Sequence, residues 1–178
     1  RLETAFGGGK THALIACVHI AKRGRELAGV TKDLLEESLL PESDSVAVVG
    51  ISGDEIPVNE IKGDSLIPYT LWGELAYQLG GKDLYAAVRR DAESFAAPGR
   101  NFLEKVLGDR KALILLDELA QYAARLEVAH TDGASQLAAF LMSLNGYAKN
   151  HSGIAIILTL AGTTDAFSKQ TERLTELL

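Results

Sequence analysis

The chain has 178 residues with a formal net charge of −6, and 47% of the residues are hydrophobic. This balance is that of a folded domain with a full-sized core, and it excludes disordered, collagen-like and coiled-coil classes. No apolar run approaches the roughly 20 residues of a membrane-spanning helix, and an acidic chain lacks the domain-wide positive charge of many nucleic-acid binders. We therefore expect a cytoplasmic protein without a membrane partner.

The most informative segment lies near the start, where residues 4–11 read Thr-Ala-Phe-Gly-Gly-Gly-Lys-Thr. Glycine backbone can wrap a phosphate with successive N–H groups, and a helix N-terminus behind it favours negative charge. The lysine of such a loop neutralises phosphate oxygens, and the next hydroxyl binds Mg²⁺. The segment predicts a nucleotide site with Lys10 and Thr11 in these two roles. The predicted nucleotide-binding residues are Phe6, Gly7, Gly8, Gly9, Lys10, Thr11 and His12.

One position departs from the P-loop pattern G-x-x-x-x-G-K-[ST], because Thr4 stands where the first glycine belongs. Gly9, Lys10 and Thr11 match the pattern. Residues 13–20 are apolar on nearly every side, so we expect the helix after the loop to be buried against a sheet.

Three short apolar runs have the composition of strands that are buried on both faces, at residues 45–52, 112–116 and 154–160. Residues 53–69 contain two prolines and little periodicity, which predicts a loop. Strands that alternate with helices predict one α/β domain with a mainly parallel sheet.

Helical patterns separate these runs. Thr70 predicts the N-cap of a helix that continues through Leu79 and ends at the glycines that follow. Residues 83–96 and 135–149 each place apolar side chains on one face, as helices that cover a sheet do.

A further short helix is predicted after Pro98 and Gly99, which separate it from the preceding one. Asn101 and Glu104 resemble a capping box at its start, and Gly108 suits its end.

The second chemical feature is the acidic pair Asp117-Glu118, which directly follows the run 112–116. The ends of parallel strands meet at the carboxyl edge of a sheet, where α/β proteins bind ligands. Asp117 there predicts a Mg²⁺ ligand, and Glu118 predicts the residue that orients or deprotonates the attacking water. The alternative is that both acids only favour the start of the next helix through its dipole.

These segments resemble the ASCE division of P-loop NTPases, in which the catalytic Glu follows the Walker B Asp, and more narrowly the AAA-type ATPases. The chain also resembles a large bacterial and archaeal family of uncharacterised ATPases, a domain of unknown function. The matching segments, which span most of the chain, are 6–12 (FGGGKTH), 70–80 (TLWGELAYQLG), 115–122 (LLDELAQY) and 158–167 (LTLAGTTDAF).

The resemblance implies a three-layer P-loop fold with a mainly parallel sheet flanked by helices. It places the strand 154–160 between the P-loop strand and the Walker B strand. A polar sensor residue would follow that strand, with Thr159, Thr163 and Thr164 as candidates and Thr163 as our prediction. The competing role for the last two is to cap the helix that follows.

We accordingly expect residues 1–178 to be the core of an ATPase, cut from a longer protein that contains the rest of the first strand and the lid. The expected activity is Mg²⁺-dependent ATP hydrolysis by Lys10, Glu118 and Thr163, with Mg²⁺ held by Thr11 and Asp117. The cycle would remodel or move a protein or DNA partner, within a homo-oligomer. The alternatives are a STAND-like nucleotide switch with slow hydrolysis and a small-molecule P-loop kinase.

Overall fold

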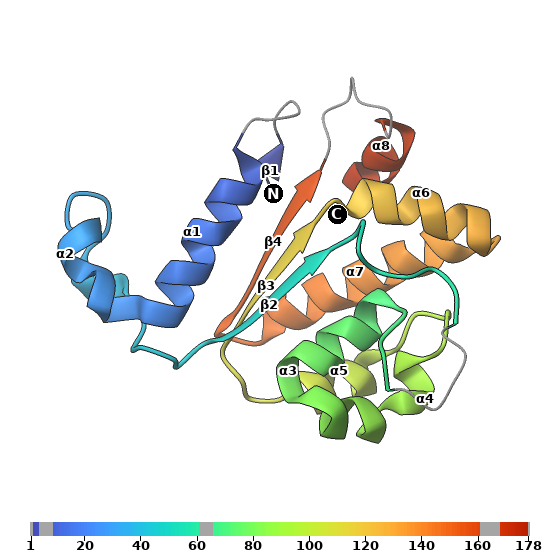
Figure 1. Cartoon of the computed structure of the whole chain (residues 1–178), viewed down its shortest axis with the longest axis horizontal. Coiled ribbons are helices and arrows are strands. Elements are labelled where there is room, and N and C mark those ends of the chain that lie inside the picture. Colours follow the sequence, from blue (N-terminus) through green and yellow to red (C-terminus); the bar gives the residue numbers. More distant parts are fainter. Residues whose placement is uncertain (1, 4–8, 61–65, 161–167, 178) are drawn as a thin grey trace.

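The structure is a computed structural model, and it describes residues 2–3, 9–60, 66–160 and 168–177 (Figure 1). None of the helices within these ranges combines the length and the apolarity that a membrane crossing requires.

A parallel sheet organises the chain, with its strands in the order β1 (Leu2–Glu3), β4 (Ile154–Leu160), β3 (Ala112–Asp117) and β2 (Ala47–Ser52). Strands β2, β3 and β4 begin level with one another, because Ala47 pairs with Ala112, which pairs with Ile154. Their carboxyl ends therefore meet at one edge. The three predicted strands are confirmed, and β4 lies between β1 and β3 as the resemblance implied.

Each face of the sheet has its own apolar cluster. Ile114 and Leu116 of β3 face a large cluster, whereas Leu113 and Leu115 of the same strand face a small one. The large cluster includes buried side chains of α3 (Leu71–Ala87), α4 (Arg89–Ala92), α5 (Arg100–Val106), α6 (Leu119–Ala129), α7 (Gly133–Asn150) and α8 (Ser168–Leu177). The small one receives buried residues from α1 (Lys10–Arg23). The protein is thus an α/β domain with a parallel sheet flanked by helices.

The helix α1 is less buried than its apolar sequence predicts. Leu14 and Ala21 are buried, but Ala13 is exposed and Ile15 is 49% exposed. The helix packs against the sheet as predicted, through Leu14 and Ala21, but its outer side is exposed. The reason is that the described part of the chain supplies one helix layer outside this face of the sheet, and nothing covers the outer side of α1.

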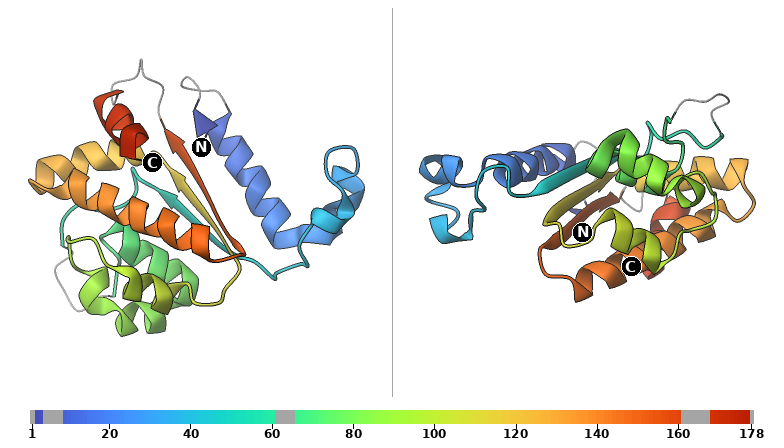
Figure 2. Two further views of the ribbon diagram at one scale, coloured as in Figure 1. Left: turned by 180° about the vertical axis from the view of Figure 1, so that it is seen from behind. Right: turned by 90° about the horizontal axis from the view of Figure 1, so that it is seen from below.

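Beyond α1 the chain forms short helical turns, η1 (Gly24–Leu27), α2 (Ala28–Thr31) and η2 (Glu37–Leu39), before it enters β2. These turns project away from the sheet in all the views of Figures 1 and 2.

The Thr70 cap is confirmed, because its hydroxyl accepts a hydrogen bond of 2.9 Å from the N–H of Gly73. The predicted helix stop is instead a break within α3, where Gly81 has φ 64° and ψ −155°. Residues 83–96 do not form the one helix that was predicted, since α3 ends at Ala87 and α4 covers 89–92.

Side chains at the start of α3 explain why α4 ends at Ala92 and does not continue to residue 96. The indole N–H of Trp72 donates to the carbonyls of Asp91 and Ser94, and the Thr70 hydroxyl donates to the carbonyl of Ala92. Carbonyl groups that bond to α3 in this way are turned away from the axis of a continuing helix. Trp72 is itself fully buried, as a core residue.

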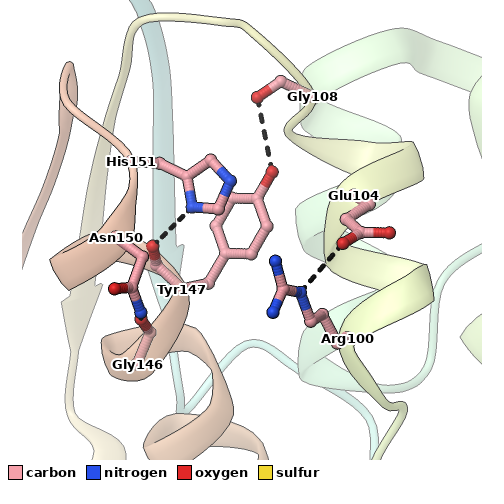
Figure 3. A network of polar contacts seen from close by, with 7 residues as sticks. All are labelled: Arg100, Glu104, Gly108, Gly146, Tyr147, Asn150 and His151. Carbon is pink, nitrogen blue, oxygen red and sulfur yellow. Dashed lines mark hydrogen bonds and ion pairs between the residues drawn. The ribbon is translucent and has the colours of Figure 1, made fainter.

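The capping box predicted at Asn101 was wrong. The helix α5 begins at Arg100 with Gly99 as a cap that makes no side-chain hydrogen bond, so Asn101 lies inside the helix. Glu104 instead accepts a hydrogen bond of 2.8 Å from Nε of Arg100 (Figure 3). The capping-box pattern gave the wrong partner because Glu104 lies one helical turn from Arg100. The positive charge of Arg100 attracts the Glu104 carboxylate more strongly than a backbone N–H does.

The prediction of α7 is confirmed, because Leu137, Phe140, Leu141 and Leu144 are all buried along one side of it. At its carboxyl end the rings of Tyr147 and His151 stack, with their centroids 3.7 Å apart (Figure 3).

Gly146 in α7 offers a test of this packing. A Cβ built there meets no atom within 4 Å, and glycine inside a helix costs about 0.5–1 kcal/mol relative to alanine. Gly146→Ala should therefore raise the free energy of unfolding by about that amount in urea titrations. Gly73→Ala is the matched control, because its Cβ would lie 2.8 Å from the Thr70 hydroxyl oxygen. A gain at Gly73, or a loss at Gly146, would contradict this packing.

Candidate functional site

The start of α1 lies in the region where the carboxyl ends of β3 and β4 meet. Gly9 precedes the helix in the left-handed conformation (φ 76°, ψ 12°), which glycine adopts without steric cost. The helix begins at Lys10, so the first-turn N–H groups have no partners within the helix. Helix N-termini of this kind bind anions such as phosphate.

A hydrogen bond joins this helix to the end of β3. The Thr11 hydroxyl donates to Oδ2 of Asp117 over 3.1 Å, although the two residues are 106 positions apart in the chain. The fold therefore brings together the two residues that the sequence predicts as Mg²⁺ ligands.

The Asp117 carboxylate accepts two further hydrogen bonds at its other oxygen. Oδ1 accepts from the N–H of Glu118 at 3.0 Å and from the hydroxyl of Thr159. Thr159 is 1% exposed and lies near the end of β4, the strand next to β3. Donors from α1, β4 and the start of α6 thus hold one carboxylate in a single orientation.

Glu118 has a strained backbone. Its φ of 53° and ψ of 33° place it in the left-handed region, which costs a residue with a side chain about 1–3 kcal/mol. Such strain occurs mainly where a functional group must be held in one position. Glu118 precedes α6 without making a side-chain cap, so capping does not explain why an acid stands there.

The loop after β2 packs closely against this strained turn. The N–H of Gly53 donates to the carbonyl of Asp117 at 2.9 Å, and a Cβ at Gly53 would lie 2.5 Å from the carbonyl oxygen of Glu118. Only glycine fits such a close approach. Tyr122, one turn along α6, is fully buried here, and burial raises the pKa of its hydroxyl to about 12.

Two side chains of α6 and its end hold the same loop in place. The Arg125 guanidinium donates to the carbonyls of Asp54, at 2.5 Å, and Ile56. His130 Nε2 lies 2.7 Å from the carbonyl oxygen of Val58, so it is the protonated nitrogen and donates. Sequence reasoning missed both residues, because partners about 70 positions away leave no local pattern.

The other predicted site residues fall into two groups. Lys10 is half-buried at the start of α1, and His12 is exposed on the same helix. Phe6, Gly7, Gly8 and Thr163, together with the alternative Thr164, lie outside the described residues.

A metal held only by protein groups does not fit this site. Within the described ranges, no three His, Cys, Asp or Glu side chains gather as a metal site. Thr11 and Asp117 offer hard oxygen atoms, which suit Mg²⁺ when phosphate oxygens and water complete its six ligands.

Fold and site together define an α/β protein in which polar side chains lie close together at the carboxyl edge of a parallel sheet. Residues 1–176 match the model of the DUF499 N-terminal domain, and the chain belongs to this family, a domain of unknown function. A search of the curated proteins and a search of the solved structures gave no match.

The bond from Thr159 to Asp117 can be tested by removing the hydroxyl alone. Hydrogen bonds to charged groups contribute about 1.5–3 kcal/mol, so the isosteric change Thr159→Val should lower the free energy of unfolding by about that amount. Thr159→Ser, which keeps the hydroxyl, should be less destabilising than Thr159→Val in the same urea titration. If the valine variant were the more stable of the two, the bond would not hold the carboxylate.

Proposed function

We propose that this domain binds ATP with Mg²⁺ and hydrolyses it, as a P-loop ATPase. The observation that carries the proposal is the 3.1 Å contact between the Thr11 hydroxyl and the Asp117 carboxylate. In P-loop NTPases the hydroxyl of this loop and the Walker B carboxylate hold the same Mg²⁺ ion. The contact therefore supports a shared metal site rather than two unrelated polar residues.

The sheet supports the same proposal. Strand β4 lies between the strand that precedes the glycine loop and the strand that ends in Asp117, which is the arrangement implied by the resemblance to AAA-type ATPases. In an open parallel sheet the ligand crevice lies outside the carboxyl ends of the strands, where Thr11 and Asp117 lie.

The binding roles follow from charge and geometry. The first-turn N–H groups of α1 and the Lys10 ammonium group would bind the phosphates, with the glycine loop wrapped around them. Thr11 and Asp117 would hold Mg²⁺, whose charge offsets that of the phosphate oxygens. An acidic domain can bind a polyanion in this way because the favourable charges are local.

The hydrolytic role belongs to Glu118. Its backbone is held in a strained conformation next to Asp117, and the carboxylate would orient the attacking water and accept its proton. Thr159 acts on Asp117 through a hydrogen bond and is a positioning residue. Thr163 remains the predicted sensor. The hydrolysis cycle would serve to remodel or move a macromolecular partner.

Lys10→Ala should abolish the thermal stabilisation of the protein by Mg-ATP, because the ammonium group that binds the phosphates is lost. At 100 times its Kd the nucleotide should stabilise the unchanged chain by about 2.7 kcal/mol, which is roughly 5–10 °C for this size. Lys22→Ala, at the exposed end of α1, is the matched control and should keep the full shift. An undiminished shift in Lys10→Ala would contradict the assignment of the loop.

Glu118→Gln should bind Mg-ATP as tightly as the unchanged chain and hydrolyse it at least about 100-fold more slowly, because the amide cannot accept a proton. Phosphate release measures turnover, and the melting shift measures binding in the same sample. Glu37→Gln, exposed on η2 away from the sheet edge, should leave both quantities unchanged. Normal turnover in Glu118→Gln would assign the general base to another residue.

A further inference from the structure

Residues 24–45, named here the 24–45 lobe, comprise η1, α2, η2 and the turns that join them to β2. The lobe projects from the end of α1 and stands clear of the sheet and of the other helices (Figures 1 and 2).

The lobe exposes an unusual amount of apolar surface. Val30 is 78% exposed, Leu34 is 83% exposed and Leu39 is 69% exposed. Seven large hydrophobic side chains are exposed in the described part of the chain, and three of them lie in this one lobe. Grouped apolar side chains with a polar rim are typical of protein interaction sites, whereas single ones are not.

The lobe also carries most of the net charge. It contains six acidic residues and two basic ones, so its charge is −4 out of −6 for the whole chain. Arg25 pairs with Glu42, and Glu26 lies 3.7 Å from Arg23 of α1. Asp33, Glu36 and Glu37 are exposed and adjacent in the chain to the apolar residues, and within the described ranges no cation forms an ion pair with them.

Hydrogen bonds to the end of α1 and a close contact at Gly24 hold the lobe in one shape without a partner. The N–H of Asp44 donates to the carbonyl of Lys22 at 2.8 Å, and the Ser43 hydroxyl donates to the carbonyl of Arg23 at 2.9 Å. Gly24 has φ 47°, and a Cβ there would lie 1.9 Å from the carbonyl oxygen of Pro41. A surface that is already ordered binds with a smaller loss of conformational entropy.

We propose that the 24–45 lobe is a docking surface for a basic amphipathic helix of a partner protein. Leucine-like side chains of that helix would cover Val30, Leu34 and Leu39, and its Lys or Arg side chains would face the acids. The lobe charge argues against a second copy of this chain, because two surfaces of −4 would repel one another. This proposal does not depend on nucleotide binding.

The apolar part of the proposal can be tested with a fluorescent peptide of leucine and lysine at amphipathic helical spacing, by anisotropy on the full chain without nucleotide. Val30→Ser with Leu34→Ser should weaken binding by at least about tenfold. Val128→Ser, on α6 and 91% exposed, is the matched control and should bind as the unchanged chain does. A peptide with serine in place of leucine should bind far more weakly.

The role of the acidic residues can be tested with the double variant Glu36→Lys with Glu37→Lys. Both positions are exposed, so this variant provides a test even if Val30→Ser with Leu34→Ser does not fold. Binding should again fall by at least about tenfold, and added salt should weaken binding to the unchanged chain. Asp83→Lys with Asp109→Lys makes the same change in charge away from the lobe and should have little effect. Equal losses in lobe and control variants would overturn the proposal. So would self-association of the chain that Val30→Ser with Leu34→Ser abolishes.

Discussion

The carboxylate of Asp117 is the point on which the geometry of the site depends. It accepts hydrogen bonds from Thr11 of α1, from Thr159 of β4 and from the N–H of Glu118. These donors come from segments that are far apart in the sequence. The two oxygen atoms of one carboxylate can accept hydrogen bonds from all of them. The level start of β3 and β4 makes the arrangement geometrically possible, because it brings the ends of both strands to one edge. The Asp117 carboxylate thereby joins the start of α1 to the sheet, in addition to the apolar packing of Leu14 and Ala21 against β3.

The two faces of the sheet differ in how many helices cover them, and this difference explains why α1 is partly exposed. The large cluster buries Trp72, Phe140 and other bulky side chains under several helices, whereas α1 covers the opposite face. On the outer side of α1, Ile15 is half exposed. The same helix leads without interruption from the candidate phosphate site into the 24–45 lobe. A partner that binds the lobe would therefore act on an element whose other end contains Lys10.

The loop after β2 is an integral part of the site because α6 holds it. Arg125 and His130 bind its carbonyl groups, and Gly53 permits the close approach to Glu118. Carbonyl groups of a loop need donors when they are removed from water, and a guanidinium group supplies several at once. The strained conformation of Glu118 is thus supported from both sides, by the sheet and by this loop.

The sequence by itself determined three of the strands, the Thr70 cap, most of α7 and the pair Thr11 and Asp117 that the fold brings together, because apolar periodicity, capping and phosphate-loop chemistry are local properties. It predicted wrongly where side-chain contacts compete with the pattern that a segment shows on its own. Trp72 binds the carbonyl groups of Asp91 and Ser94, at the end of the predicted helix 83–96, and Arg100 pairs with Glu104 four residues further on, within the predicted capping box. Only the tertiary structure decided that Thr159 contacts Asp117, that Arg125 holds the loop after β2, and that α1 stays partly exposed. Each of these depends on which segments meet in space, and residue spacing along the chain carries no record of that.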